Sequence, residues 1–233
     1  APSRKAGRSK SVDGSGGAGK RLRVKGCILG EKRMEFLDTK IERNGYIFYG
    51  KFSEGLFQEW LEITSILASK SDLKNELLFQ VGFSIYKLIE VEKEQFRLVS
   101  IDYEANPFKD FTEDLTVALW IQSEQASLAK ELQINPLEIR FDDKLLIAKG
   151  VFEDEHSYLQ RQNTQSQRDS GWFMGHQKQD NENFVAIHAF ELLKWNPKLI
   201  KVLVLPTDYL VIVNDGEIHK ILNDSDEEIF PIS

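Results

Sequence analysis

The clearest alternation of apolar and polar positions lies in residues 35–52, on both sides of Asn44-Gly45. Alternation with a period of two is typical of a β-strand, and Asn-Gly is the dipeptide that most favours a tight hairpin turn. Over residues 54–68 the apolar positions recur every three or four residues instead. This spacing predicts an amphipathic helix, with Ser53 as its N-cap.

Residues 73–103 fit both periods, because their apolar positions alternate strictly and also recur at a helical interval. Their aromatic and β-branched content favours strands over 77–91 and 95–103, joined by a turn at 92–94. A second amphipathic helix is predicted over 112–132, capped by Thr112, with an apolar stripe formed by Val117, Ile121, Leu128 and Leu132.

Asn135-Pro136 ends that helix, and residues 136–143 are predicted to be a linker. The segments that follow are short and apolar, and they predict a helix over 186–195 and strands over 144–149, 199–205, 209–213 and 217–222. The sequence therefore predicts an α+β fold of two small mixed units, in which antiparallel β-sheets each pack with one or two helices. We expect an N-terminal domain over 34–140 and a C-terminal domain over 141–233.

Residues 1–33 differ from the rest of the chain in charge, with ten basic and two acidic residues and a net charge of +8. Residues 1–20 are small, polar and basic without hydrophobic periodicity, which predicts disorder. One interpretation is an arm for nucleic-acid binding or targeting. The interpretation that we favour is sequence foreign to the natural protein, with Met34 as the native start, because Met34 directly precedes the first well-patterned segment.

The remaining 200 residues hold 20 basic and 35 acidic groups, a net charge of −15. Such a body repels nucleic acids and membrane surfaces and speeds encounter with basic partners. No apolar run approaches the roughly 18 residues that span a bilayer. The single cysteine, Cys27, excludes an internal disulfide framework and a cysteine-rich metal site. Together with the lack of a secretory pattern, these features predict a cytoplasmic protein.

No motif imposes a chemistry by its spacing. The four histidines lie at no metal-ligand spacing, and Ser170 lacks the Gly-x-Ser-x-Gly context of a hydrolase nucleophile. Acidic runs at 142–143, 153–155 and 224–228 could bind a divalent cation, but such runs are usually solvated loops. We therefore expect no catalytic residue, no metal site and no cofactor.

The least generic run of the chain is Asp169-Ser170-Gly171-Trp172-Phe173-Met174-Gly175. Its glycines permit an unusual turn, and its bulky aromatic pair, Trp172 and Phe173, either fills the core or contacts a partner. We favour the core.

The C-terminal segments resemble the immunity protein 33-like domain family over about residues 144–222. The features that carry the resemblance are, in order, Leu145-Leu146-Ile147-Ala148-Lys149, Tyr158-Leu159-Gln160-Arg161, Asp169-Ser170-Gly171-Trp172-Phe173, Asp180-Asn181-Glu182-Asn183 and Asn196-Pro197-Lys198-Leu199-Ile200. Members of the family are inferred to neutralise bacterial polymorphic toxins and are not known to be enzymes. The family tends to place an acidic pair soon after Gly-Trp, whereas this chain has Gly175-His176-Gln177-Lys178 there, which implies a different partner specificity.

The resemblance and the acidic body together favour a bacterial, cytoplasmic immunity protein that binds a cognate toxin by surface complementarity. A basic toxin such as a nuclease would suit this charge. The candidate partner-binding residues are Asp169, Ser170, Gly171, Trp172, Phe173, Glu153, Asp154, Glu155 and Asp180. Two other classes stay open, namely a metal-dependent hydrolase that uses the acidic loops and histidines, and a nucleic-acid-binding adaptor that acts through the basic tail.

Overall fold

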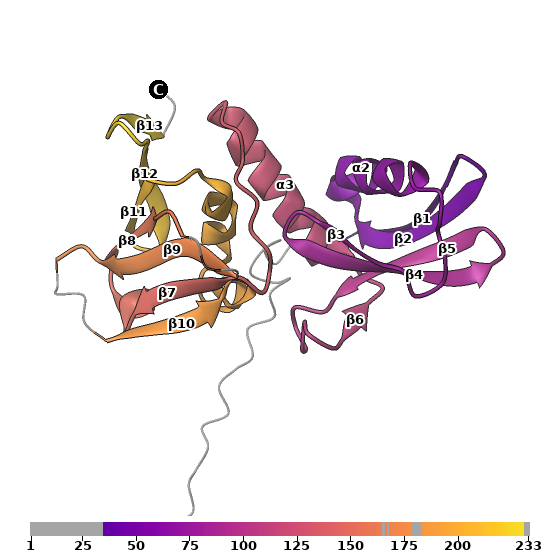
Figure 1. The fold of residues 1–233 in the computed structure, drawn as a ribbon, viewed down its shortest axis with the longest axis horizontal. Helices are drawn as coiled ribbons and strands as arrows, with labels where there is room; N and C mark the ends of the chain where they lie inside the picture. The colour runs from indigo at the N-terminus through magenta and orange to yellow at the C-terminus, as the bar shows by residue number, and fades with distance from the viewer. Residues whose placement is uncertain (1–34, 165, 167, 179–182, 231–233) are drawn as a thin grey trace, which may run out of the picture.

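The computed structural model describes residues 35–164, 166, 168–178 and 183–230, which form two lobes with one β-sheet each (Figure 1). The predictions made for residues 1–33, Met34 and Asp180 lie outside these ranges. The predicted α+β class is confirmed. Each sheet contains one parallel strand pair in addition to its antiparallel pairs, so both sheets are mixed.

The N-terminal sheet has the strand order β1-β2-β5-β4-β3, and β6 pairs with β5. The predicted first hairpin is confirmed, because Asn44 and Gly45 both adopt positive φ (53° and 83°) between its two strands. Its strands are β1 (Phe36–Arg43), β2 (Tyr46–Ser53), β3 (Leu78–Val81), β4 (Ser84–Glu92), β5 (Gln95–Ile101) and β6 (Phe111–Thr112). The single strand predicted over 77–91 is wrong, because a turn at Gly82 (φ +52°) divides it into β3 and β4.

The first predicted helix is confirmed as a 3₁₀ turn, η1 (Glu54–Leu56), that continues into α2 (Phe57–Ala68). Trp60, Ile63 and Leu67 are fully buried on its inner face. Ser53 lies at the predicted N-cap position, directly before η1, with an extended backbone. The Ser53 side chain makes no capping bond, and its backbone N–H donates instead to Thr116 Oγ1 at 3.0 Å.

The second predicted helix is α3 (Thr116–Glu131), which starts four residues later than predicted. Thr112 lies in β6 and does not cap the helix, so this prediction is also wrong. Asp114 provides the capping contact, because its Oδ1 accepts a 3.0 Å hydrogen bond from the Thr116 N–H. In Figure 1, α3 crosses between the two lobes, where it packs against α2 on one side and the C-terminal helical segment η4 (Pro197–Val204) on the other.

The C-terminal sheet has the strand order β10-β7-β9-β8-β11-β12-β13. Its strands are β7 (Lys144–Ala148), β8 (His156–Arg161), β9 (Asp169–His176), β10 (Phe184–His188), β11 (Leu210–Asn214), β12 (Glu217–Leu222) and β13 (Glu228–Phe230). The predicted turn after β11 is confirmed, because Asp215 and Gly216 have positive φ. Short helical segments complete the lobe, namely η2 (Val151–Glu153), η3 (Ala189–Glu191), α4 (Leu192–Trp195) and η4.

Two secondary-structure predictions in this lobe are wrong. Residues 186–188, predicted to begin a helix, instead belong to β10 and pair with β7. Residues 199–205, predicted to form a buried strand, are helical up to Val204. Asn196 is the reason for the second difference, because its side chain accepts a hydrogen bond from the Lys198 N–H and so begins a helix with Pro197 in its first turn.

Residues 136–143, the predicted linker, contain no helix or strand, but this segment is packed against both lobes. The Leu137 N–H donates to Val204 O at 2.8 Å, and the Phe141 N–H donates to Phe83 O at 3.0 Å. Ile139 and Phe141 are buried. The connection therefore ties the N-terminal sheet to the C-terminal helical segments.

Candidate functional site

The run from Asp169 to Phe173 is part of strand β9 and contains a bulge, since its pairing with β7 shifts register there. Gly171 has φ +76°, and a Cβ at this position would lie 2.1 Å from Gln162 O. Only glycine fits such a backbone. The neighbouring polar groups support the bulge, because Asp169 Oδ1 accepts from the Gly171 N–H and Ser170 Oγ accepts from the Trp172 N–H.

The aromatic pair of this run divides between the two faces of the sheet. Trp172 is 1% exposed and its Nε1 donates to Leu203 O at 3.0 Å, which confirms the preference for the core. Phe173 is half-buried on the opposite face, 5.7 Å from the Tyr158 ring and 5.0 Å from the Phe184 ring. Strand alternation therefore gives the two neighbours different roles.

Arg161 is the buried cation of this region and has 4% exposure. Burial lowers the pKa of its guanidinium to about 10, so the group stays charged at neutral pH. It donates hydrogen bonds to the backbone carbonyls of Leu137, Glu138, Ser170, Leu203 and Leu205. From the sequence, Arg161 was recognised only as part of the family pattern. Its role depends on five main-chain carbonyls, and most of them lie far from it in the sequence.

Ser170 has no arrangement for nucleophilic catalysis. It is 5% exposed, and its hydroxyl donates to Lys144 O at 2.6 Å. The four histidines lie in four different strands. Three of them contact different partners, with His156 Nδ1 on Asn214 Oδ1, His176 Nδ1 on Asp154 Oδ2 and His188 Nδ1 on Asp142 O. Among the described residues, no three His, Cys, Asp or Glu side chains are placed to hold a metal ion.

The predicted acidic residues Glu153, Asp154 and Glu155 lie at the end of η2 and in the turn before β8. They line a hollow at one end of the C-terminal sheet, together with the carboxylate of Asp215. A hydrogen bond from the His156 N–H and a second from the His176 side chain lower the pKa of the Asp154 carboxyl. No basic side chain is among the twelve residues that line this hollow. The fold thus brings four carboxylates together from two loops.

An aromatic pair forms one wall of the same hollow. The Phe152 and Trp195 rings stack with centroids 5.1 Å apart and an interplanar angle of 2°. Trp195 is nevertheless 60% exposed, the largest exposed fraction among the exposed large hydrophobic side chains of the described residues. Sequence reasoning missed both residues, and the one available signal was a tryptophan directly before the helix-ending Asn196-Pro197.

The predicted partner-binding residues therefore do not form one site. Glu153, Asp154 and Glu155 line the acidic hollow, whereas Phe173 lies on the outer face of the sheet. Trp172 and Ser170 are in the interior. Asp169 and Gly171 shape the bulge, and Asp180 lies outside the described residues.

Comparison with protein families matches residues 124–224 to the Imm33-like domain. Residues 124–224 form an Imm33-like domain. The resemblance seen over residues 144–222 is thus confirmed, and the Imm33-like match extends it into the second half of α3. The chain matches no curated protein and no solved structure.

An Imm33-like domain indicates an immunity protein, and immunity domains of this kind are typically non-catalytic. The implied partner is a cognate toxin. None of the described helices is long and apolar enough to cross a membrane.

Proposed function

We propose that this protein is a bacterial immunity protein that neutralises a cognate protein toxin by binding it, without catalysing a reaction. The observation that carries the proposal is the Imm33-like domain at residues 124–224. The polar groups support binding without catalysis, because the Ser170 hydroxyl and the Arg161 guanidinium both donate to main-chain carbonyls inside the lobe.

The acidic hollow is the surface that we assign to the toxin. Glu153, Asp154, Glu155 and Asp215 concentrate negative charge there, which favours a basic partner such as a nuclease. Inhibition would follow from steric and electrostatic occupation of the cleft in which the toxin binds phosphate.

Trp195 is the anchor that we expect at this interface. Tryptophan is enriched among the residues that dominate binding energies, which cluster near the centre of an interface. Its stacking on Phe152 holds the ring in place before binding, so little side-chain freedom is lost on association. A lysine or arginine of the toxin could lie on the exposed face of the indole and pair with the nearby carboxylates.

The first experiment identifies the toxin and measures its inhibition. The protein is co-expressed with the product of the neighbouring gene and isolated as a complex, and toxin activity is measured with and without it. A toxin that is bound and inhibited supports the proposal. A neighbouring toxin that is neither bound nor inhibited rejects it.

The second experiment tests the surface. Trp195→Ala should weaken toxin binding about 30-fold or more, as expected for a central aromatic anchor worth about 2 kcal/mol. The matched control is Phe57→Ala, which removes an aromatic side chain with 40% exposure from α2 in the other lobe. Equal affinities for both variants would reject the acidic hollow while leaving the immunity function intact.

A further inference from the structure

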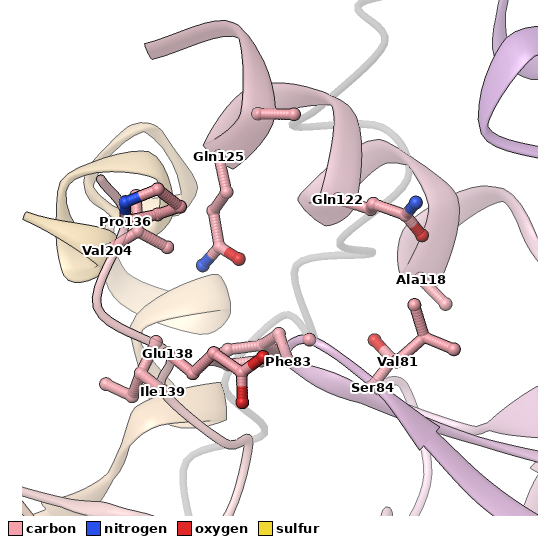
Figure 2. A pocket seen from close by; sticks show the side chains of 12 residues that line it. Val81, Phe83, Ser84, Ala118, Gln122, Gln125, Pro136, Glu138, Ile139 and Val204 are labelled. Carbon is pink, nitrogen blue, oxygen red and sulfur yellow. The ribbon is translucent and has the colours of Figure 1, made fainter. Parts of the chain in front are cut away.

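A cavity of about 190 Å³ lies where the two lobes meet, beneath α3 (Figure 2). Its walls come from the β3–β4 turn, from α3, from the connecting segment and from the end of η4. Most of its surface is apolar, provided by side chains such as Phe83, Ile139 and Val204. Apolar protein cavities of about 150 Å³ accept a benzene ring. This cavity can therefore hold one ring or a branched aliphatic group.

Two glutamines of α3, Gln122 and Gln125, line this cavity and differ in how their amide oxygens are placed. Gln125, which is 7% exposed, donates through Nε2 to Ile200 O at 3.1 Å. Gln122 donates through Nε2 to Glu62 Oε2 at 3.1 Å. Ile200 O and Glu62 Oε2 can only accept a hydrogen bond. Each glutamine therefore turns its amide nitrogen toward this partner and its Oε1 away from it.

Of the two oxygens, only that of Gln125 faces the cavity. Gln122 Oε1 is buried and has no hydrogen-bond partner among the described residues. Figure 2 shows the Gln125 amide extending from α3 into the cavity, with its oxygen toward the open space. A bound group with an N–H or O–H would donate a hydrogen bond to this oxygen.

Glu138 adds a negative charge to the same cavity. It is exposed and also lines the cavity, which places its carboxylate at the rim. No Lys, Arg or His is among the twelve lining residues. The polar groups that face the cavity are thus the Gln125 amide oxygen, the Glu138 carboxylate and the Ser84 hydroxyl, which is already bonded to Tyr103.

We propose that this cavity binds a small molecule with an apolar body of about one ring and a single ammonium group. The apolar walls take the body, the amide oxygen of Gln125 accepts a hydrogen bond from the ammonium, and Glu138 balances its charge. A neutral donor would satisfy the Gln125 amide but not use the carboxylate, and an anion would be repelled by the carboxylate.

The cavity combines the Imm33-like domain with the region that precedes it. Gln125, Glu138 and Val204 lie within residues 124–224, whereas Phe83 and Gln122 lie before them. A ligand bound here would contact both lobes and strengthen their association. This gives the N-terminal lobe a role that is independent of toxin binding at the acidic hollow.

The test uses three probes of one shape that differ only in the polar group, namely benzylamine, benzyl alcohol and toluene. Each is titrated at neutral pH into the full chain, and binding is followed by NMR shifts of Phe83, Ala118 and Val204. We expect saturable binding with benzylamine tightest and toluene weakest. Comparable affinities for toluene and benzylamine, shifts at other residues, or no saturable binding would overturn the proposal.

Two variants test the assigned contacts. Glu138→Gln should weaken benzylamine about five- to tenfold and leave benzyl alcohol unchanged, because it removes a charge-assisted contact. Glu131→Gln, on exposed α3 surface outside the lining, is the matched control and should change neither affinity. An unchanged benzylamine affinity in Glu138→Gln would reject the assigned ammonium position.

Gln122→Met provides a second control. It removes a buried oxygen that does not face the cavity, so it should leave the benzylamine affinity unchanged. A clear loss of benzylamine affinity in this variant would contradict the assignment of the acceptor to Gln125.

Discussion

Arg161 and Trp172 donate hydrogen bonds to the same carbonyl oxygen, that of Leu203, at 3.1 Å and 3.0 Å. The guanidinium carbon of Arg161 lies 5.8 Å from the indole ring centre, so the two side chains also contact each other. Leu203 lies in the last turn of η4, where backbone carbonyls lack intrahelical partners and attract a cation. The pair therefore fixes the end of η4 against the sheet.

The first prediction concerns Arg161. Arg161→Met keeps much of the apolar stem but leaves five main-chain carbonyls without this donor, so the free energy of unfolding should fall by about 3 kcal/mol or more. Urea unfolding measures the change. Arg140→Met is the control, because its side chain is 44% exposed and its ion pair with Asp142 should be worth less than about 1 kcal/mol. Equal effects of the two variants would contradict the anchoring role.

The second prediction separates packing from hydrogen bonding at Trp172. Trp172→Ala should destabilise the protein by about 3–5 kcal/mol, as is usual for a buried aromatic. Trp172→Phe keeps a ring but loses the bond to Leu203 and part of the indole volume, and it should cost less. Thermal and urea unfolding of both variants give the comparison. An unchanged melting temperature in Trp172→Ala would show that the ring is not part of the core.

The third prediction concerns the bulge in β9. Gly171→Ala places a Cβ 2.1 Å from Gln162 O at a positive φ, so unfolding free energy should fall by more than about 2 kcal/mol. Gly55→Ala is the matched control, since its Cβ would meet no atom within 4 Å and it lies in the helical turn η1. The control should be neutral or stabilising by up to about 1 kcal/mol. Similar losses in both variants would argue against a bulge that requires glycine.

The fourth prediction is a pH dependence at Asp154. Its folded-state pKa lies below its unfolded value, so the stability it contributes is fully present above the unfolded pKa of about 3.9 and is lost as pH falls through the folded pKa. Asp154→Asn should therefore be less stable than the natural sequence at neutral pH, and the difference should shrink under strongly acidic conditions. Urea unfolding between about pH 2 and pH 7 measures this difference. A difference that grows on acidification would have the wrong sign. Glu155→Gln controls for the loss of one negative charge.

The fifth prediction concerns the rate of toxin binding. If the acidic hollow steers a basic toxin, raising salt from about 0.1 M to about 1 M should slow association far more than it speeds dissociation, because the screening length falls from about 10 Å to about 3 Å. Reversing the charges of Glu153, Asp154 and Glu155 together should reduce this salt dependence. The same reversal at Glu90, Glu92 and Glu94 in the other lobe is the control for net charge. A salt-independent association rate would leave the acidic charge as a solubility feature.

Local chemistry determined several parts of the fold. Asn44-Gly45 and Asp215-Gly216 form hairpin turns because their short side chains, or the lack of one, tolerate positive φ. Helix α2 follows from the spacing of its apolar residues, which matches one helical face. The turns and the helix depend on residues that are neighbours in the sequence. The run around Trp172, together with the order of the segments from Leu145 to Ile200, also indicated the Imm33-like domain.

Tertiary structure decided what the local pattern left undetermined. Residues 199–205 are apolar except for Lys201, so their pattern fits a buried strand as well as a buried helix. The cap from Asn196 and the donors from Arg161 and Trp172 stabilise the helix. The candidate sites have the same origin, because Trp195 meets Glu153 and Asp215 only when distant loops converge, and the cavity at Gln125 exists only where both lobes meet. Sequence spacing does not encode such contacts, since they arise from the packing of segments far apart in the chain.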